Sequence, residues 1–323
     1  MTPLHGLHHV TAITADAQTN VDFYTRTLGL RLVKRTINYD DPTSYHLYYG
    51  DAVGTPGTIM TFFAWPHGRR GSAGTGQVAE TSFAVPTGAL GWWESHLAAK
   101  GVSTQNVTRF GDKALLFNDP DGLPLSLIET AHLPQTRDWA NAGIAAEHAI
   151  RAFHGVTLFE TDAAQPASVL INHFGYREAA REENRIRYLS ADGAAKVVDV
   201  VLVKNHNFPR IGAGQVHHVA FRTPTDDEQA KWLETLRAAG HNVSPVMDRD
   251  YFHSIYFREP GGTLFEIATD TPGFTVNEPV ETLGEKIALP AWLEPERAKV
   301  EAGLPPLDLK SSESMLQHVQ RSP

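Results

Sequence analysis

Two histidine pairs stand out in the sequence, because imidazole side chains bind transition metals and transfer protons near neutral pH. Residues 6–14 read GLHHVTAIT, and residues 214–222 read GQVHHVAFR. Each pair opens a short apolar strand directly after a glycine-containing turn. A pair of surface histidines would explain one such stretch. Two similar strand openings so far apart instead indicate one metal site that is assembled from two copies of the same structural unit.

Four copies of that unit can be traced along the chain. In each copy a first strand leads into a helical segment, then a glycine that ends the helix, then further strands. The glycine follows a fixed position of the first strand after 20, 21, 20 and 22 residues. These positions and their glycines are His9 and Gly29, Glu80 and Gly101, Gly155 and Gly175, and His218 and Gly240. The order and spacing predict an α+β chain of four βαβββ modules.

This arrangement resembles the vicinal oxygen chelate superfamily of glyoxalases, bleomycin resistance proteins and extradiol dioxygenases. The resemblance covers residues 4–272 and implies that the modules pair into two cup-shaped mixed β-sheets. In that superfamily a metal ion lies in a cup and is held by the first and last strands of the modules. We expect an N-terminal domain over 1–131 with modules 1 and 2, a C-terminal domain over 150–272 with modules 3 and 4, and an extended tail over 273–323.

The candidate metal ligands follow from aligned positions on the first and last strands of each module. Module 1 offers His9 and Thr61, module 2 Glu80 and Glu129, module 3 Gly155 and Asp199, and module 4 His218 and Glu266. Modules 1 and 4 together supply His9, His218 and Glu266, the two imidazoles and one carboxylate typical of non-heme Fe(II) oxygenases. Modules 2 and 3 supply carboxylates only, which make a poor iron site but could hold a hard cation weakly. We therefore expect module 1 to share a cup with module 4, and module 2 with module 3.

His8 and His217 are the other possible imidazole ligands, because neighbouring side chains on a strand point to opposite faces. We prefer His9 and His218, since Thr11 and Ala220 follow them on the same face and since the superfamily's ligand directly precedes the apolar core of the strand. Strict alternation would leave His8 and His217 outside the cup, and they reach it only if the starts of the strands bend.

Thr61 bears on the reaction class. Glyoxalase-type lyases of the superfamily use a carboxylate ligand from each module, whereas a threonine leaves a coordination position open for substrate and oxygen. The division of the ligands between the first and last modules resembles the hydroquinone-type ring-cleaving dioxygenases, which act on para-diols. The resemblance implies Fe(II) as the cofactor, although two imidazoles and a carboxylate can also hold Zn, Mn or Ni.

The expected function is thus an extradiol-type ring cleavage of hydroquinones or related aromatic diols with O2. Two alternatives stay open. One is a glyoxalase-like, metal-dependent lyase or isomerase, and the other is a binding protein without catalysis.

The same resemblance marks residues around the metal. It implies an acid–base role for His217 and a hydrogen bond from Tyr256 to a substrate oxygen. It implies that His8, Thr11 and Arg249 contact the substrate, with Arg249 neutralising a distal oxygen or a carboxylate. A packing aromatic would equally explain Tyr256, and a surface charge would explain Arg249.

Composition limits the remaining possibilities. The 323 residues contain no Cys, which excludes disulfides, thiolate metal sites and cysteine nucleophiles. The net charge of −9 argues against nucleic acid as a partner. No apolar run is long enough for a membrane span, and no signal peptide is recognised. We expect a cytoplasmic homodimer or higher homo-oligomer whose partners are a small aromatic substrate and O2.

Two connecting segments and the C-terminal tail complete the prediction. Residues 67–70 (HGRR) are expected in a solvated loop or lid, and residues 131–150 in a loop with a short helix. The tail is expected to wrap the outside of the fold, with a helix over 294–302. Disorder is expected in the last ten residues.

Overall fold

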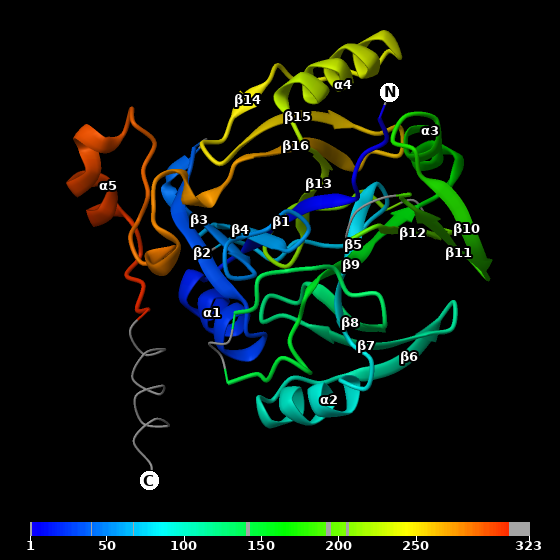
Figure 1. The fold of residues 1–323 in the computed structure, drawn as a ribbon, viewed down its shortest axis with the longest axis horizontal. Coiled ribbons are helices and arrows are strands. Elements are labelled where there is room, and N and C mark those ends of the chain that lie inside the picture. The colour runs from blue at the N-terminus through cyan, green and yellow to red at the C-terminus, as the bar shows by residue number, and fades with distance from the viewer. Residues whose placement is uncertain are drawn as a thin grey trace.

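The computed structural model describes residues 2–39, 41–66, 68–139, 143–191, 195–204 and 207–309. Four modules follow one another in the predicted order (Figure 1). Module 1 comprises β1 (Leu7–Thr14), α1 (Ala17–Asp22), the π-helix η1 (Phe23–Thr27), β2 (Arg31–Asn38), β3 (Asp41–Gly50) and β4 (Ile59–Ala64). Module 2 comprises β5 (Gln77–Pro86), α2 (Leu90–Ala99), β6 (Gln105–Arg109), β7 (Asp112–Asn118) and β8 (Pro124–Thr130).

The second half of the chain repeats this plan. Module 3 comprises β9 (Ala152–Glu160), α3 (Ala164–Asn172), β10 (Arg177–Glu182), β11 (Arg185–Leu189) and β12 (Val197–Leu202). Module 4 comprises β13 (Val216–Thr223), α4 (Asp226–Ala238), β14 (Met247–Asp248), β15 (Phe252–Arg258) and β16 (Leu264–Pro272). The tail contains η2 (Phe274–Val276), η3 (Val280–Thr282), η4 (Glu294–Glu296) and α5 (Arg297–Gly303).

The strands form two eight-stranded mixed sheets. The first has the order β14-β15-β16-β13-β1-β4-β3-β2, and the second has the order β10-β11-β12-β9-β5-β8-β7-β6. Within a module the first and last strands are parallel, whereas β1 pairs with β13, and β5 with β9, in antiparallel fashion. Module 1 therefore shares the first cup with module 4, and module 2 shares the second cup with module 3. The predicted pairing and the prediction of two cup-shaped sheets are both confirmed, and each cup takes one module from each half of the chain.

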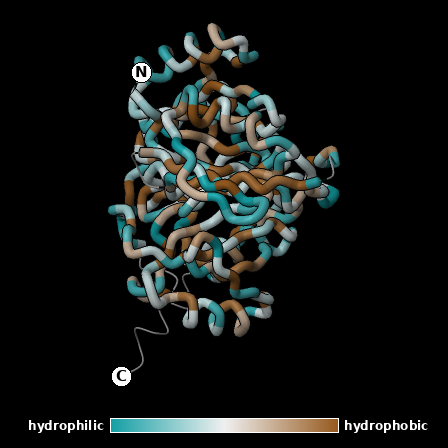
Figure 2. The backbone as a smooth tube through the Cα atoms, turned by 90° about the vertical axis from the view of Figure 1, so that its right-hand side faces the viewer, coloured by the Kyte–Doolittle hydropathy of each residue, from teal (hydrophilic) through white to brown (hydrophobic). Residues whose placement is uncertain are grey.

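The module helices lie outside the sheets, as α4 illustrates. Thr225 caps its first turn by accepting a hydrogen bond from the backbone N–H of Glu228, and Trp232 and Leu236 are buried on its inner face. Figure 1 shows α4 above β15 and β16, and α2 on the opposite side of the molecule. Apolar strands cross the middle of the molecule in Figure 2. The predicted helix-ending glycines all have positive φ angles, between 74° and 89°, which an L-residue adopts only with strain.

The sheet register corrects one aligned position. In each module the residue two places after the first-strand position pairs with the equivalent residue of the last strand. These pairs are Thr11 with Thr61, Ser82 with Ser126, Thr157 with Asp199, and Ala220 with Glu266. The counterpart of Glu266 in module 2 is therefore Ser126, and the prediction of Glu129 as a cup residue was wrong.

The side chain of Glu129 is used elsewhere. Glu129 lies three positions beyond Ser126, and an odd shift along a strand turns the side chain to the other face of the sheet. There its Oε1 accepts hydrogen bonds from the backbone N–H groups of Gly88 and Leu90 at the start of α2.

The tail packs against the outer strands of module 1. Lys34 on β2 is fully buried, and its ammonium group donates to Asn277 and pairs with Glu278. The hydroxyl of Tyr45 on β3 donates to the carbonyl of Pro305. The helix expected over 294–302 is present as η4 and α5, whereas the described part of the linker contains a turn at 146–148 in place of the expected helix.

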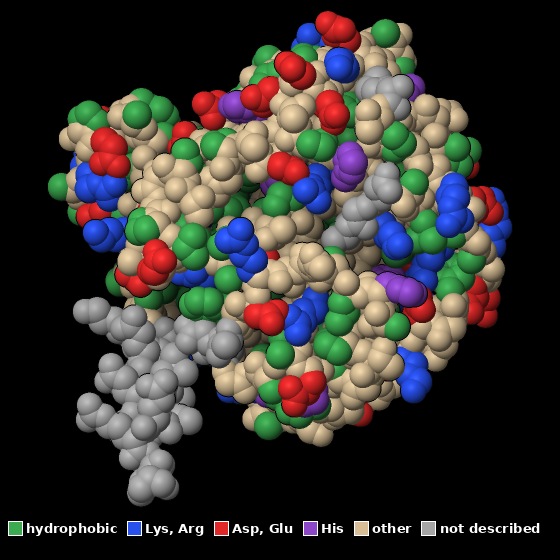
Figure 3. Space-filling view, viewed as in Figure 1, with side chains coloured by type: hydrophobic (Ala, Val, Ile, Leu, Met, Phe, Trp, Pro, Cys, Tyr) green, Lys and Arg blue, Asp and Glu red, His purple; other side chains and the backbone are tan. Residues whose placement is uncertain are grey.

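Two of the predicted segments lie partly or wholly outside the described residues. His67 of the HGRR stretch and the last ten residues lie outside the described residues. Figure 3 shows acidic and basic side chains interspersed over the visible face. No helix in the described ranges is both long and apolar enough to cross a membrane.

Candidate metal centre

Three side chains from three strands converge in the first cup. His9 of β1, His218 of β13 and Glu266 of β16 are 2, 4 and 0% exposed, respectively. The Nε2 atoms of His9 and His218 are 3.3 Å apart, and they lie 3.2 and 2.9 Å from Oε2 of Glu266. The sequence predicted this group, and the antiparallel pairing of β1 with β13 brings together two residues that are 209 positions apart.

The three atoms have the geometry and chemistry of a metal site. Bonds of roughly 2.1 Å separate neighbouring ligands of an octahedral ion by about 3.0 Å and those of a tetrahedral ion by about 3.4 Å. Of the observed distances, 3.2 and 3.3 Å fall in that range, and 2.9 Å is close to its lower end. Although Oε2 of Glu266 is buried and close to two imidazoles, it makes no hydrogen bond within the described residues. A buried carboxylate oxygen without a hydrogen bond is costly, and a cation at the centre of this triangle would satisfy it.

The residues preceding the two histidines orient them. His8 and His217 are the extra residues of β-bulges, since the β1–β13 register skips each of them. A bulge departs from strict alternation and brings consecutive side chains together. The Nδ1 atoms of His8 and His9 are 2.9 Å apart, and those of His217 and His218 are 2.8 Å apart. When Nδ1 of the ligand histidine donates in this hydrogen bond, its Nε2 keeps the lone pair that a metal needs.

Burial determines the charge of this cluster. Burial raises the pKa of Glu266, but the adjacent His9 and His218 outweigh this effect and hold the pKa well below its usual range. Burial lowers the pKa of His8 well below its ordinary value and that of His217 to about 3, with the neighbouring histidine acting in the same direction. A carboxylate with a lowered pKa is anionic at neutral pH, and this is the form that binds a divalent cation. The hydroxyl of Ser254 donates to the other carboxylate oxygen, Oε1, and thereby orients it.

Most of the predicted substrate residues line one cavity beside this centre. Its volume is about 310 Å³, and its lining includes the predicted residues His9, Thr11, His217, His218, Arg249 and Tyr256. Arg249 donates from Nε to the hydroxyl of Tyr256 over 3.3 Å. Strict alternation would leave His217 outside the cup, but the bulge bends the start of the strand and turns its ring inward.

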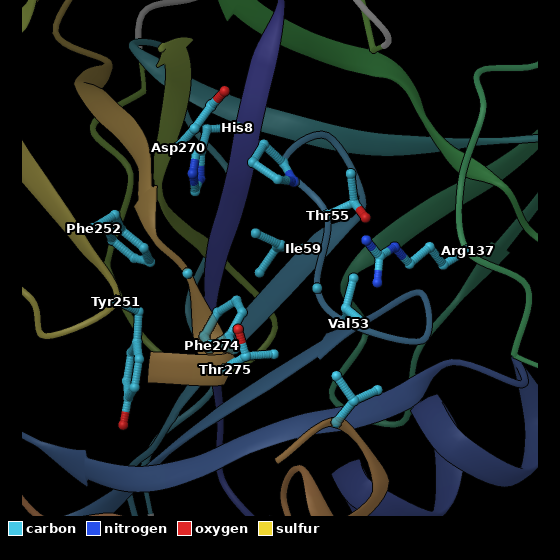
Figure 4. A pocket seen from close by; sticks show the side chains of 14 residues that line it. His8, Val53, Thr55, Ile59, Arg137, Tyr251, Phe252, Asp270, Phe274 and Thr275 are labelled. Atoms are coloured by element: carbon cyan, nitrogen blue, oxygen red, sulfur yellow. The ribbon is translucent and has the colours of Figure 1, made fainter. Parts of the chain in front are cut away.

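His8 lies apart from the other predicted residues. It lines a separate cavity of about 390 Å³ (Figure 4). The Phe252 ring contacts both neighbours, with centroids 5.1 Å from His8 and 4.9 Å from His9, and it lines both cavities. The position of His8 therefore suits a partner of the metal ligand His9 rather than a substrate contact.

The sequence interpretation missed the module 1 wall of the cavity. His46 and Tyr48 of β3 belong to this wall. The cavity as a whole is also lined by aromatic side chains, namely Tyr39, Phe63 and Trp65 of the first half of the chain and Phe252 of module 4. The signal was present in the stretch SYHLYYGD, where His46 and Tyr48 are two residues apart and so share one face of a strand. Tyr48 pairs with Thr61, which places that face inside the cup.

Comparison with known proteins gives consistent relationships. Residues 6–127 and 153–267 match the family model described as the Glyoxalase/Bleomycin resistance protein/Dioxygenase superfamily. The chain is 43% identical over 305 residues to the "Putative ring-cleaving dioxygenase MhqO" of Bacillus subtilis (strain 168), covering 94% of this chain and 97% of that protein. It is 38% identical over 299 residues to the "Chlorohydroquinone/hydroquinone 1,2-dioxygenase" of Sphingobium indicum, covering 90% and 93% of the two chains.

A solved structure agrees with these relationships. The crystal structure of a protein described as a "putative dioxygenase" from Bacillus subtilis superposes with a TM-score of 0.93 at 43% identity, covering 96% of this chain and 99% of that one. The resemblance inferred from the four modules and the divided ligand set is therefore confirmed.

Proposed function

The chain belongs to the Glyoxalase/Bleomycin resistance protein/Dioxygenase superfamily, and from this membership we propose that it is an Fe(II)-dependent ring-cleaving dioxygenase that acts on hydroquinones. The observation that carries the proposal is the composition of the metal centre. Two imidazoles and one carboxylate occupy one side, while the counterpart of Glu266 is the neutral Thr61. Such a ligand set with open positions is typical of non-heme Fe(II) oxygenases.

Ferrous iron held there would supply the electron transfer that lets dioxygen react with an aromatic ring. The chain's own groups bind and orient that ring. A cavity of about 150 Å³ can already hold benzene, so the 310 Å³ cavity has room for a substituted single ring. Its aromatic lining offers stacking and edge contacts. Arg249 and Tyr256 form one polar end, where the guanidinium can neutralise a phenolate oxygen.

The proposed cleavage differs from the extradiol type that was expected from the sequence. The name of the Sphingobium relative specifies 1,2-cleavage of hydroquinone, in which the broken bond lies beside a single hydroxyl-bearing carbon. We therefore propose ring opening next to one hydroxyl of a para-diol, with the second hydroxyl held away from the metal.

Oxygen consumption tests the proposal. The protein would be loaded anaerobically with Fe(II) and then mixed with air-saturated buffer containing hydroquinone, chlorohydroquinone or catechol. We expect oxygen uptake with the para-diols and the appearance of a ring-opened acid by mass spectrometry. The Glu266→Gln variant, which loses the anionic ligand, is the matched control and should consume no oxygen. No uptake with any of the diols would contradict the proposal.

A glyoxalase-like lyase is distinguished by the same preparation. A lyase would be active with Ni or Zn and would not require oxygen. The Thr61 position disfavours it, because a threonine can replace neither the fourth anionic ligand nor a carboxylate base.

A further inference from the structure

We propose that His46 is a positioning residue: through Thr61 it turns the Thr11 hydroxyl toward the open side of the metal centre, where that hydroxyl donates to the oxygen of a phenolate. The inference rests on the proposed function in one respect, namely that the ligand is a phenol. It assigns a role to the module 1 wall of the cavity, opposite the wall that carries Arg249 and Tyr256.

Four side chains form one continuous hydrogen-bonded chain along this wall. The hydroxyl of Tyr48 is 2.8 Å from Nδ1 of His46, and Nε2 of His46 is 2.8 Å from Oγ1 of Thr61. The Thr61 hydroxyl donates to Oγ1 of Thr11 over 2.9 Å. Tyr48, Thr61 and Thr11 are 3, 0 and 1% exposed, respectively, whereas His46 is partly exposed. His46, Tyr48 and Thr11 all line the cavity.

The chain has a preferred direction. Burial lowers the pKa of His46 well below its usual value, so the ring is neutral and carries one N–H. The single hydroxyl proton of Thr61 is donated to Thr11, so Nε2 of His46 must donate to Thr61. In a neutral ring Nδ1 then accepts from the hydroxyl of Tyr48, whose pKa is raised by burial. The hydroxyl of Thr11 keeps a proton of its own, and it donates this proton to no side chain or carbonyl among the described residues. Aligned hydrogen bonds of this kind polarise one another and strengthen the terminal donor.

The corresponding positions of module 4 indicate where that proton points. Tyr48 pairs with Thr61 as Tyr256 pairs with Glu266, and Thr11 pairs with Thr61 as Ala220 pairs with Glu266. In module 4 the carboxylate of Glu266 reaches the metal position, steadied by Ser254.

In module 1 the shorter Thr61 leaves that side open, and His46 lies where module 4 has Ser254. The structure thus replaces a fourth ligand with a hydroxyl donor that faces the vacated position. An anionic oxygen is the ligand that such a donor stabilises most.

A binding experiment measures this donor without any turnover. Protein loaded with Zn(II) would be titrated with 4-nitrophenol across a range of pH, because nitrophenolate absorbs visible light and nitrophenol does not. The readout is the pKa of the bound nitrophenol. A hydrogen bond to an anion typically contributes enough to shift that pKa by about one unit or more.

Two substitutions of His46 separate positioning from packing. The amide nitrogen of His46→Gln reaches the place of Nε2 and can still donate to Thr61, so the pKa of bound nitrophenol should stay near that of the unsubstituted protein. His46→Asn reaches only the place of Nδ1, so the pKa should rise by about one unit. Metal analysis of each variant verifies that Zn(II) remains bound.

The double variant decides whether His46 acts through Thr11. Thr11→Val removes the terminal donor and should raise the pKa at least as much as His46→Asn does. In the Thr11→Val background, His46→Asn should then have no further effect. The proposal is overturned by an unchanged pKa in His46→Asn, by additive shifts in the double variant, or by the absence of bound nitrophenolate in the unsubstituted protein. If the shifts appear but hydroquinones cause no oxygen uptake, the ring-cleaving function fails while the role of His46 stands.

Discussion

The two cups share one scaffold but use their carboxylates in opposite ways. In the first cup Glu266 faces two imidazoles and keeps an oxygen that makes no hydrogen bond within the described part of the chain. In the second cup the carboxylate of Glu80 accepts hydrogen bonds from both terminal nitrogens of Arg109, at 2.6 and 3.0 Å, and from two serines. Asp199 likewise receives Arg187 at 2.9 and 3.1 Å, and Arg185 at 3.2 Å.

The backbone of the two cups is alike even in its irregularities. The β5–β9 register skips Ala79 and His154, just as the β1–β13 register skips His8 and His217. The bulges are thus a property of the scaffold, whereas the side chains that they carry differ. His154 follows the module plan but precedes Gly155, so it has no ligand to orient.

An acidic residue at a ligand position is therefore not enough for a metal site. A guanidinium that already occupies both carboxylate oxygens replaces the cation and removes the site's affinity for one. The first cup differs because no arginine pairs with Glu266 among the described residues, and its Oε2 makes no hydrogen bond there. We expect a metal ion to bind to this free oxygen and to the two imidazoles.

The largest expected effect is loss of the metal from the first cup alone. His9→Ala and His218→Ala should each reduce bound metal from about one ion per chain to near zero, because each removes one of only three ligands. Oxygen uptake should fall to background in both variants. Elemental analysis after gel filtration measures the first effect. Glu80→Ala is the matched control in the second cup, and the contrast between the cups would fail if this variant lost metal while His9→Ala kept it.

The orienting histidines provide the next largest effect. His8→Ala and His217→Ala should weaken metal binding by about 10- to 100-fold, as substitution of a hydrogen-bond partner of a metal-bound histidine typically does. Competition with a chelator of known affinity gives the constants. The equivalent substitution in the second cup, His154→Ala, should leave the affinity unchanged. Equal losses in all three variants would mean that the bulges matter only for folding.

The junction between the cups should respond to pH. Glu160 at the end of β9 is 1% exposed, and the hydroxyl of Thr263 from the first cup lies 3.2 Å from its Oε1. Burial, followed by the nearby Glu259, raises the pKa of Glu160 to about 8. A carboxyl with a raised pKa contributes stability that is complete below its unfolded pKa and is lost as the pH rises through about 8.

Glu160→Gln should therefore remove part of the fall in unfolding free energy that occurs between the unfolded pKa and pH 8. Each unit of realised pKa shift corresponds to about 1.4 kcal/mol. Urea denaturation at several pH values measures the difference between the variant and the unsubstituted protein. A constant difference across that range would show that Glu160 does not titrate as described.

The smallest expected effect concerns the stability of the second cup. Glu80→Gln keeps an acceptor for Ser126 but removes the charge that pairs with Arg109. Since both side chains are slightly exposed, solvent screens the pair, and we expect a loss of about 1 kcal/mol in the free energy of unfolding. Metal content should not change. A loss above several kcal/mol would instead identify the arginine pairs as the main support of this cup.

Much of the fold was readable because the modules repeat. The helix-ending glycines and the spacing gave the four modules, and the distribution of histidines gave the pairing of modules 1 and 4. Glu129 was misassigned because spacing alone does not determine strand register, and a shift of three residues inverts the face. The orientation of His217 stayed open for a related reason, since a β-bulge depends on how two strands distant in sequence pair.

The module 1 wall of the cavity was missed because its residues lack a repeated pattern. His46 has Ser254 as its module 4 counterpart, so comparison of the modules did not mark it. Its role depends on the contacts of Thr61, which only the register of β1, β3 and β4 reveals. The arginines of the second cup were also not anticipated, because ion pairs between different strands cannot be inferred from spacing along one strand.

The central claim is that one cup binds the metal and the other does not. Anomalous scattering at the iron absorption edge, measured on crystals of Fe(II)-loaded protein, tests it most directly. We expect a single peak within bonding distance of His9 Nε2, His218 Nε2 and Glu266 Oε2, and none beside Glu80 or Asp199. A peak in the second cup, or no peak between the two histidines and Glu266, would contradict it.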